Sequence, residues 1–104
     1  MKIVINRIVT CSLRKIKPEN FLNYTSKSEI KYKREILEYL QSFEDCAFTS
    51  EPVYDILTKE SVRDADNAKT DGLFTWYWSE IYHFDKYNLC LKDEFVKHVL
   101  RSKN

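Results

Sequence analysis

A single glycine, Gly72, stands in a chain of 104 residues. Loops that cradle phosphate groups, such as the Walker loop and the dinucleotide-binding fingerprint, require several glycines at fixed spacing. The sequence therefore argues against these nucleotide-binding folds. Because Gly72 follows Asp71, the pair is also the strongest turn signal in the chain, at the one position where a positive φ has no steric cost. We expect the chain to reverse direction there.

The length and composition indicate one folded domain spanning residues 1–104. Hydrophobic residues make up 43% of the chain and aromatic residues 14%, which is too apolar for a disordered segment. No apolar run approaches the roughly 18 residues of a membrane span, and the apolar start is interrupted by Asn6 and Arg7, so no secretory signal is expected. We therefore expect a cytoplasmic protein with no membrane partner.

Three cysteines, Cys11, Cys46 and Cys90, are widely separated and form no Cys-x-x-Cys pair. This pattern predicts neither a disulfide framework nor a zinc site, and it fits reduced thiols. Cys90 lies between two leucines, so we expect it to be a small buried hydrophobic residue.

Charge is distributed unevenly along the chain although the total is only +1. Residues 1–34 carry nine Lys or Arg against two Glu, a net charge of +7, whereas residues 44–85 carry three basic residues against ten acids, a net charge of −7. Such asymmetry bears on partners and association rates rather than on the fold.

Helical patterns dominate the chain. Ser26 and Glu29 have the spacing of a capping box, and an apolar stripe follows it, so we expect a helix over 27–42. A short helix beginning at Pro18 and covering 19–24, a helix capped by Ser79 and ending at Asn88, and a last helix over 92–101 are also expected. The last of these should bury a stripe formed by Leu91, Phe95, Val96, Val99 and Leu100.

Extended segments are fewer than helical ones. Aromatic residues alternate along 74–78, which favours a brief strand. Residues 2–10 fit a strand or a helical face, and residues 53–62 fit a short hairpin or a helical turn with a loop. Residues 63–67 read as a loop. The predicted fold is α+β and helix-dominated, a single small domain with three to four helices and a minor β component.

The residues that could support catalysis lack the necessary context. His83 and His98 are fifteen positions apart and have no Cys or carboxylate at ligand spacing. The acids at Asp64, Asp66 and Asp71 do not form a calcium loop, because Ala68 and Lys69 occupy positions that need an oxygen ligand and a glycine. No feature activates a cysteine. We expect no enzymatic activity, no cofactor and no metal.

The acidic middle of the chain is the best candidate for a binding site. Its carboxylates lie on loop-like sequence near aromatic residues, an arrangement suited to a basic protein because charge speeds association and aromatic side chains anchor the complex. A solvated loop beside core tryptophans would give the same pattern. The candidate contact residues are Asp55, Glu60, Asp64, Asp66, Asp71, Trp76, Tyr77 and Trp78, with Tyr54 nearby.

The basic segment 14–34 supports an alternative function. Its lysines and arginines could contact phosphates, while Tyr24 and Tyr32 could stack on bases. A small cytoplasmic nucleic-acid-binding or regulatory protein is therefore the second hypothesis. Against it, the pI of about 7.7 is below the usual basic footprint of such proteins.

Several short segments together resemble small bacterial immunity proteins of polymorphic-toxin and contact-dependent growth-inhibition systems. The resemblance covers roughly residues 36–98. The matching segments are Ile36-Leu37-Glu38-Tyr39-Leu40, Asp55-Ile56-Leu57-Thr58, Thr70-Asp71-Gly72-Leu73-Phe74-Thr75-Trp76, Ile81-Tyr82-His83-Phe84, Lys86-Tyr87 and Leu91-Lys92-Asp93-Glu94-Phe95. In the turn after Thr58, where the resemblance leads us to expect a glycine, this chain has Lys59-Glu60.

The resemblance implies a non-enzymatic antitoxin that binds the toxin domain of its own system, often a nuclease, and blocks it stoichiometrically. This expectation agrees with the charge pattern, because a nuclease presents cationic groups to phosphate and an acidic surface can occupy them.

Overall fold

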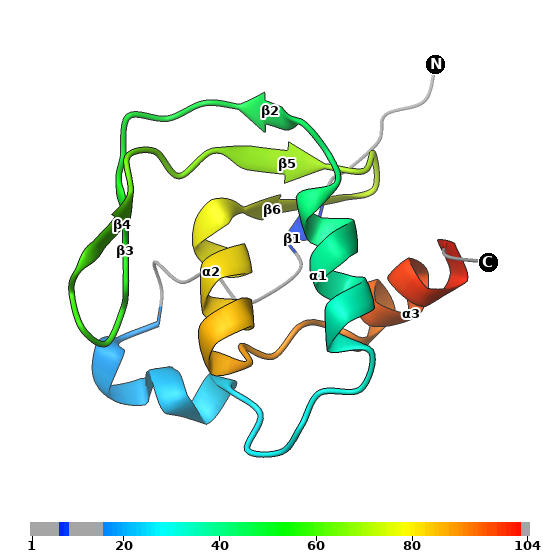
Figure 1. Cartoon of the computed structure of the whole chain (residues 1–104), viewed down its shortest axis with the longest axis horizontal. Coiled ribbons are helices and arrows are strands. Elements are labelled where there is room, and N and C mark those ends of the chain that lie inside the picture. Colours follow the sequence, from blue (N-terminus) through cyan, green and yellow to red (C-terminus); the bar gives the residue numbers. More distant parts are fainter. Residues whose placement is uncertain (1–6, 9–15, 103–104) are drawn as a thin grey trace.

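The computed structural model describes residues 7–8 and 16–102. Helices and short strands alternate with connecting loops along the chain (Figure 1). In order, the elements are β1 (Arg7–Ile8), the 3-10 helix η2 (Pro18–Tyr24), α1 (Lys33–Gln41), β2 (Asp45–Ala47), β3 (Val53–Tyr54), β4 (Ser61–Arg63), β5 (Ala68–Thr70), β6 (Phe74–Tyr77), α2 (Trp78–Tyr87) and α3 (Asp93–Ser102). The predicted α+β, helix-dominated fold is confirmed.

Four strands form one sheet in the order β1-β6-β5-β2, and β3 and β4 form a separate hairpin. Strand β6 pairs in parallel with β1 and antiparallel with β5, while β5 pairs antiparallel with β2. Figure 1 shows α1 and α2 lying side by side on one side of this sheet, with the hairpin projecting beyond α2.

The core lies where the sheet meets the helices. Strand β6 contributes Phe74 and Trp76, which alternate with half-buried residues as a one-sided strand requires. The indole of Trp76 is fully buried, and its Nε1 donates to the carbonyl of Leu40 in α1 at 3.0 Å. From α3, Phe95 and Val99 complete this cluster.

Helix α1 is shorter than predicted. It begins at Lys33 rather than near residue 27, because Tyr32 adopts the left-handed conformation at φ 62° and interrupts the helical path. The predicted capping box does not form, since Ser26 Oγ instead donates to the carbonyl of Ser28 at 2.8 Å. A side-chain bond of serine to nearby backbone competes with helix formation.

The other predicted elements fit the structure more closely. Helix α3 agrees within one residue at each end, and η2 begins at Pro18 as expected. Asn88 ends α2 in the left-handed conformation at φ 61°. Helix α2, however, begins at Trp78 and not after Ser79, so Trp78 belongs to the helix instead of the strand. The buried stripe of α3 is centred on Phe95 and Val99.

The structure also shows which conformation is adopted in the two segments whose type the sequence left open, residues 53–62 and 2–10. The hairpin is found, with β3 and β4 as its strands. It extends to Arg63, which belongs to β4 and not to the predicted 63–67 loop. Strand β5, which follows residues 63–67, was not expected from the sequence. Arg7–Ile8 are extended, while the rest of 2–10 lies outside the described residues.

Candidate functional site

The eight predicted contact residues occupy very different environments. Glu60 and Asp64 are exposed, and Tyr77 and Trp78 are half-buried. Asp55, Asp66 and Trp76 are buried, and the side chain of Asp71 is only 3% exposed. The structure therefore does not bring the eight together on one open surface, and the internal contacts of the buried members explain their burial.

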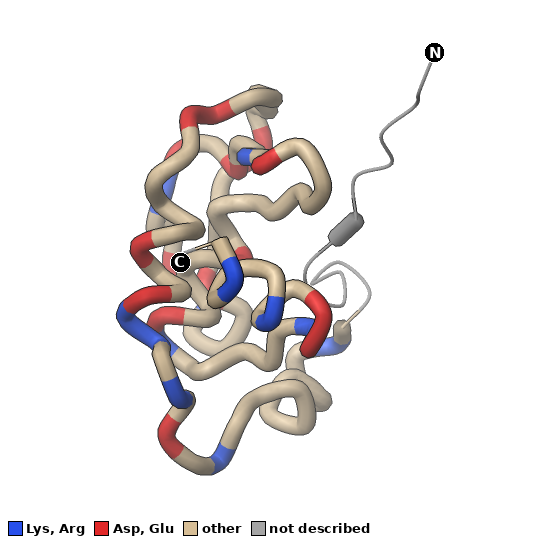
Figure 2. Tube along the Cα trace, turned by 90° about the vertical axis from the view of Figure 1, so that its right-hand side faces the viewer, with Lys and Arg blue, Asp and Glu red and all other residues tan. Residues whose placement is uncertain are grey.

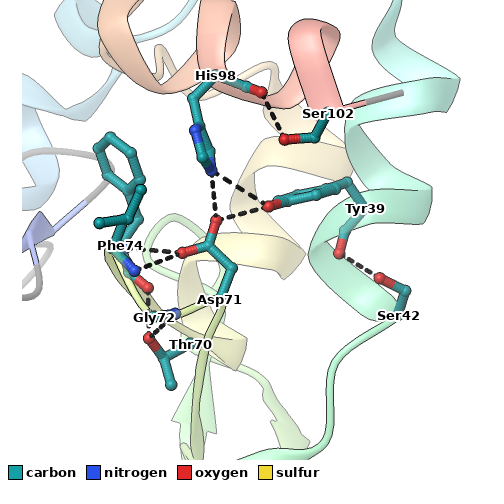
Figure 3. A network of polar contacts seen from close by, with 9 residues as sticks. Tyr39, Ser42, Thr70, Asp71, Gly72, Phe74, His98 and Ser102 are labelled. Atoms are coloured by element: carbon teal, nitrogen blue, oxygen red, sulfur yellow. Dashed lines mark hydrogen bonds and ion pairs between the residues drawn. The ribbon is translucent and has the colours of Figure 1, made fainter. Parts of the chain in front are cut away.

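Asp71 joins the turn between β5 and β6 to two helices (Figure 3). Its Oδ1 accepts from the backbone amides of Leu73 and Phe74 at 2.9 and 2.8 Å. Its Oδ2 accepts from the hydroxyl of Tyr39 in α1 at 2.6 Å and lies 3.0 Å from Nε2 of His98 in α3. Asp71 is thus a structural link.

The pKa values of this network follow from its geometry. Burial alone would raise the pKa of the Asp71 carboxyl, but the hydrogen bonds from Tyr39 and the turn amides lower it overall. Burial and the bond to Asp71 raise the pKa of Tyr39 to about 12. The folded protein therefore favours an ionised Asp71 beside a neutral phenol.

Asp55 plays a similar role in the β3–β4 hairpin. Its Oδ1 accepts from the amides of Leu57 and Thr58 at 2.8 and 2.9 Å, which closes the hairpin turn. Its Oδ2 accepts from the hydroxyls of Tyr82 and Tyr87 in α2, each at 2.7 Å. Burial would raise the pKa of Asp55, but these donors together hold it well below its ordinary value.

His83 provides a second bond between the hairpin and α2. Its Nε2 accepts from the amide of Ile56 at 3.0 Å, and its Nδ1 lies 2.6 Å from the carbonyl of Ser79. This pattern requires the neutral tautomer with hydrogen on Nδ1. Burial lowers the pKa of His83. The Ser79 contact lies within α2, whereas the bond from Ile56 joins positions 27 residues apart, which no local sequence pattern predicts.

Trp78 is covered by cations from its own chain. The guanidinium of Arg63 lies 4.0 Å from the ring centroid, and the ammonium of Lys69 lies 4.9 Å away. Asp45 accepts from the Trp78 indole at 3.1 Å and pairs with the buried Lys69 at 3.1 Å. These contacts hold β2, β4 and β5 against the start of α2.

Exposed apolar and acidic residues are frequent in the β3–β4 hairpin and in the segment that leads into it. Phe48 is 76% exposed and Tyr54 is 54% exposed. We call this set of residues the hairpin face. It consists of the exposed residues Phe48, Glu51, Tyr54, Leu57, Glu60, Val62 and Asp64. The sequence identified Glu60, Asp64 and the nearby Tyr54. It missed Phe48, Glu51, Leu57 and Val62.

The surrounding charge is also acidic. Residues 44–64 carry six acids against two basic residues, a net charge of −4. In the side view of Figure 2, most blue basic positions lie in the lower half of the molecule, whereas acidic positions predominate around its upper end. The charge asymmetry of the sequence is thus partly retained in space.

The cysteine prediction was wrong for Cys90, which is exposed. The neighbouring Leu89 is buried in the core, and its backbone bridges Thr25 in an antiparallel sense. Since successive side chains of an extended segment point to opposite sides, Cys90 faces outward. Cys46 is exposed as well, and Cys11 lies outside the described residues.

Among the described residues, 7–8 and 16–102, no group of three or more His, Cys, Asp or Glu side chains is arranged to hold a metal ion. No helix within the same ranges has the length and apolar character needed to cross a membrane.

No family model matches the sequence, no curated protein matches it, and no solved structure matches the fold.

Proposed function

We propose that this chain is an immunity protein that binds a cognate bacterial toxin domain in the cytoplasm and neutralises it by stoichiometric association. The hairpin face carries the proposal. It combines exposed hydrophobic side chains with exposed carboxylates, the combination that anchors and steers a basic partner. A nuclease domain fits this chemistry, because the groups that bind its phosphodiester substrate are cationic.

The most buried polar side chains are engaged in contacts within the protein itself. The carboxylates of Asp55 and Asp71 each accept four hydrogen bonds or close polar contacts from the protein itself. Both ring nitrogens of His83 are likewise engaged. These side chains hold the structure together, whereas Phe48, Tyr54 and Glu60 of the hairpin face are exposed.

Co-expression with the product of the neighbouring upstream reading frame, which the proposal expects to end in a toxin domain, tests the proposal. We expect the protein to protect cells and to form a complex of fixed stoichiometry. Phe48→Ala should weaken binding by about tenfold or more, because exposed aromatic anchors account for a large share of interface energy. Leu22→Ala is the matched control, since Leu22 is 50% exposed on η2, outside the hairpin face.

Charge reversal tests the electrostatic part of the same proposal. Glu60→Lys and Asp64→Lys should slow association and reduce its salt dependence, because both acids are exposed on the hairpin face. Glu19→Lys makes the same charge change on η2 and should leave the association rate unchanged. Absence of both protection and complex formation would contradict the immunity function.

One observation supports the alternative function of nucleic-acid binding, namely the exposure of aromatic and basic side chains in the segment 14–34. Tyr24 and Tyr32 are both exposed, and Lys27, Lys31 and Arg34 are exposed in the same segment. Stacking aromatics among cations suit single-stranded nucleic acid. Salt-dependent binding of a labelled oligonucleotide at physiological ionic strength, without any effect on the toxin, would favour this second function.

A further inference from the structure

A cavity of about 500 Å³ lies between the β3–β4 hairpin and the beginning of α2. Its volume falls within the range of roughly 300–1,000 Å³ that is usual for ligand pockets. Val53 and Ile56 give it apolar walls, Tyr54 supplies an aromatic ring, and the carboxylates of Glu51 and Asp66 line it as well. It therefore offers both apolar contact and negative charge.

Asp66 places a buried carboxylate in the wall of this cavity. It is only 8% exposed, and its two oxygens accept from the backbone amide and the hydroxyl of Ser79 at 2.8 and 2.9 Å. A carboxylate has about four acceptor positions, so about two remain. None of the ion pairs formed by the described residues includes Asp66. A buried charge without a counterion is costly, and a cation entering the cavity would offset that cost.

Other titratable groups line the cavity beside Asp66. Of the described residues that line it, Glu51, Asp55 and Asp66 carry carboxylates, whereas Lys59 carries an ammonium group. The carboxylate of Asp55 already accepts hydrogen bonds from Tyr82 and Tyr87, and the Lys86 ammonium lies 3.5 Å from it. His83 adds no charge while it accepts from the amide of Ile56. Asp66 is therefore the buried carboxylate of the cavity that has no ion-pair partner among the described residues.

We infer that this cavity receives an arginine side chain from the partner protein. A guanidinium group can bond the free positions of Asp66 and stack on the Tyr54 ring, while the arginine methylenes contact Val53 and Ile56. This inference rests on the proposed function in one respect, namely that the partner is a basic protein. It adds the chemical group that the hairpin face recognises.

Titration with N-acetyl-arginine methylamide, followed by NMR, tests the inference on the protein alone. We expect saturable shifts of the Tyr54 ring and the Ser79 amide at about millimolar ligand concentration, as befits a single side chain. The matched probe is N-acetyl-citrulline methylamide, which has nearly the same shape without the charge. It should bind at least about tenfold more weakly. Equal binding of the two probes, or no binding of either, would overturn the inference.

Variants of the cavity rim make the test specific. Glu51→Gln and Tyr54→Ala alter exposed side chains, so both proteins should fold, and each should weaken arginine binding several-fold. Glu44→Gln removes the same charge from an exposed position that does not line the cavity, and it should leave binding unchanged. Asp66→Asn should abolish binding, and its fold is checked by the NMR spectrum because Ser79 depends on Asp66.

The two proposals fail in different experiments. If the arginine probe binds but the protein neither protects cells nor binds the toxin domain, the immunity function is overturned and the cavity inference stands. If the toxin is neutralised equally by the native protein and by Glu51→Gln and Tyr54→Ala, and the probe does not bind, the cavity inference is overturned and the immunity function stands.

Discussion

At the scale of single residues, two buried carboxylates connect turns to helices. Asp71 closes its own turn through backbone amides and also reaches Tyr39 in α1 and His98 in α3. Asp55 closes the hairpin turn and binds two phenols of α2. A carboxylate can do this because its two oxygens accept several donors at once. Removing such a group leaves several buried donors without a partner.

The Asp71 network predicts a graded loss of stability. Tyr39→Phe removes one hydrogen bond and should lower the free energy of unfolding by about 1 kcal/mol. Asp71→Asn keeps the side chain's size but removes the charge that Tyr39 and His98 face, and it should cost about 2 to 3 kcal/mol. Urea denaturation at neutral pH measures both. Tyr24→Phe, at an exposed position, should change stability by less than about 0.5 kcal/mol.

The same network predicts an alkaline effect. The pKa of Tyr39 is raised to about 12 in the folded protein, whereas an unfolded tyrosine titrates near 10. The folded state therefore holds this proton more tightly, and its contribution to stability is lost as pH rises from about 10 to about 12. Tyr39→Phe should lose less stability over this interval. Parallel losses in the two proteins would contradict the role given to Tyr39.

At the scale of elements, left-handed residues mark where elements end or turn. Tyr32 precedes α1 at φ 62°, and Asn88 follows α2 at φ 61°. Lys59 turns the hairpin at φ 69°, and Gly72 turns the β5–β6 connection at φ 100°. Lys59 lies in the turn after Thr58, where the sequence resemblance led us to expect a glycine. The backbone there has the conformation that favours glycine, even though this chain places a lysine in it.

Two substitutions test the cost of these conformations. Lys59→Gly should raise the free energy of unfolding by about 0.5 kcal/mol, because relief of left-handed strain exceeds the added entropy of the unfolded chain. Gly72→Ala should lower it by about 1 kcal/mol. No atom lies within 4 Å of the Cβ that alanine would add, so the loss comes from the backbone alone. The urea midpoint of each variant checks these signs, and a stabilising Gly72→Ala would refute the explanation.

At the scale of the whole molecule, the hairpin joins the body through groups that must stay in one protonation state. His83 accepts from Ile56 only when Nε2 is unprotonated. Asp55 accepts from Tyr82 and Tyr87 as a carboxylate. Acid therefore opposes both contacts between the hairpin and α2, and with them the cavity that these elements enclose.

Stability should consequently fall in two steps as pH decreases. Burial lowers the pKa of folded His83 from its ordinary 6.5, so the unfolded state takes up a proton first and stability decreases below about pH 6.5. The pKa of Asp55 is lowered from 3.8, so its contribution is lost only as pH falls below about 4. Urea unfolding across pH 3 to 8 measures both steps. In His83→Gln the first step should shrink, and an unchanged slope between pH 5 and 6.5 would count against the role of His83.

Local patterns predicted much of the secondary structure and less of the site. The α3 stripe, the turn at Asp71 and the stop at Asn88 depend on neighbours in sequence, and all three are found. The start of α1 at Lys33 was not predictable from the capping pattern, because a left-handed Tyr32 overrides it. Exposure of individual acids was also not predictable, since Asp55 and Glu60 look alike in the sequence but only Asp55 meets the α2 tyrosines.

The sequence by itself determined the α+β class, the turn at its single glycine, the main helices and the acidic character of the middle segment. These features follow from short-range periodicity, turn chemistry and charge counts. Only the tertiary structure decided that Asp55, Asp66 and Asp71 are internal, that Phe48 is exposed, and that a cavity forms beside Asp66. The physical reason is that burial depends on contacts between residues distant in sequence, which strand pairing and helix packing bring together.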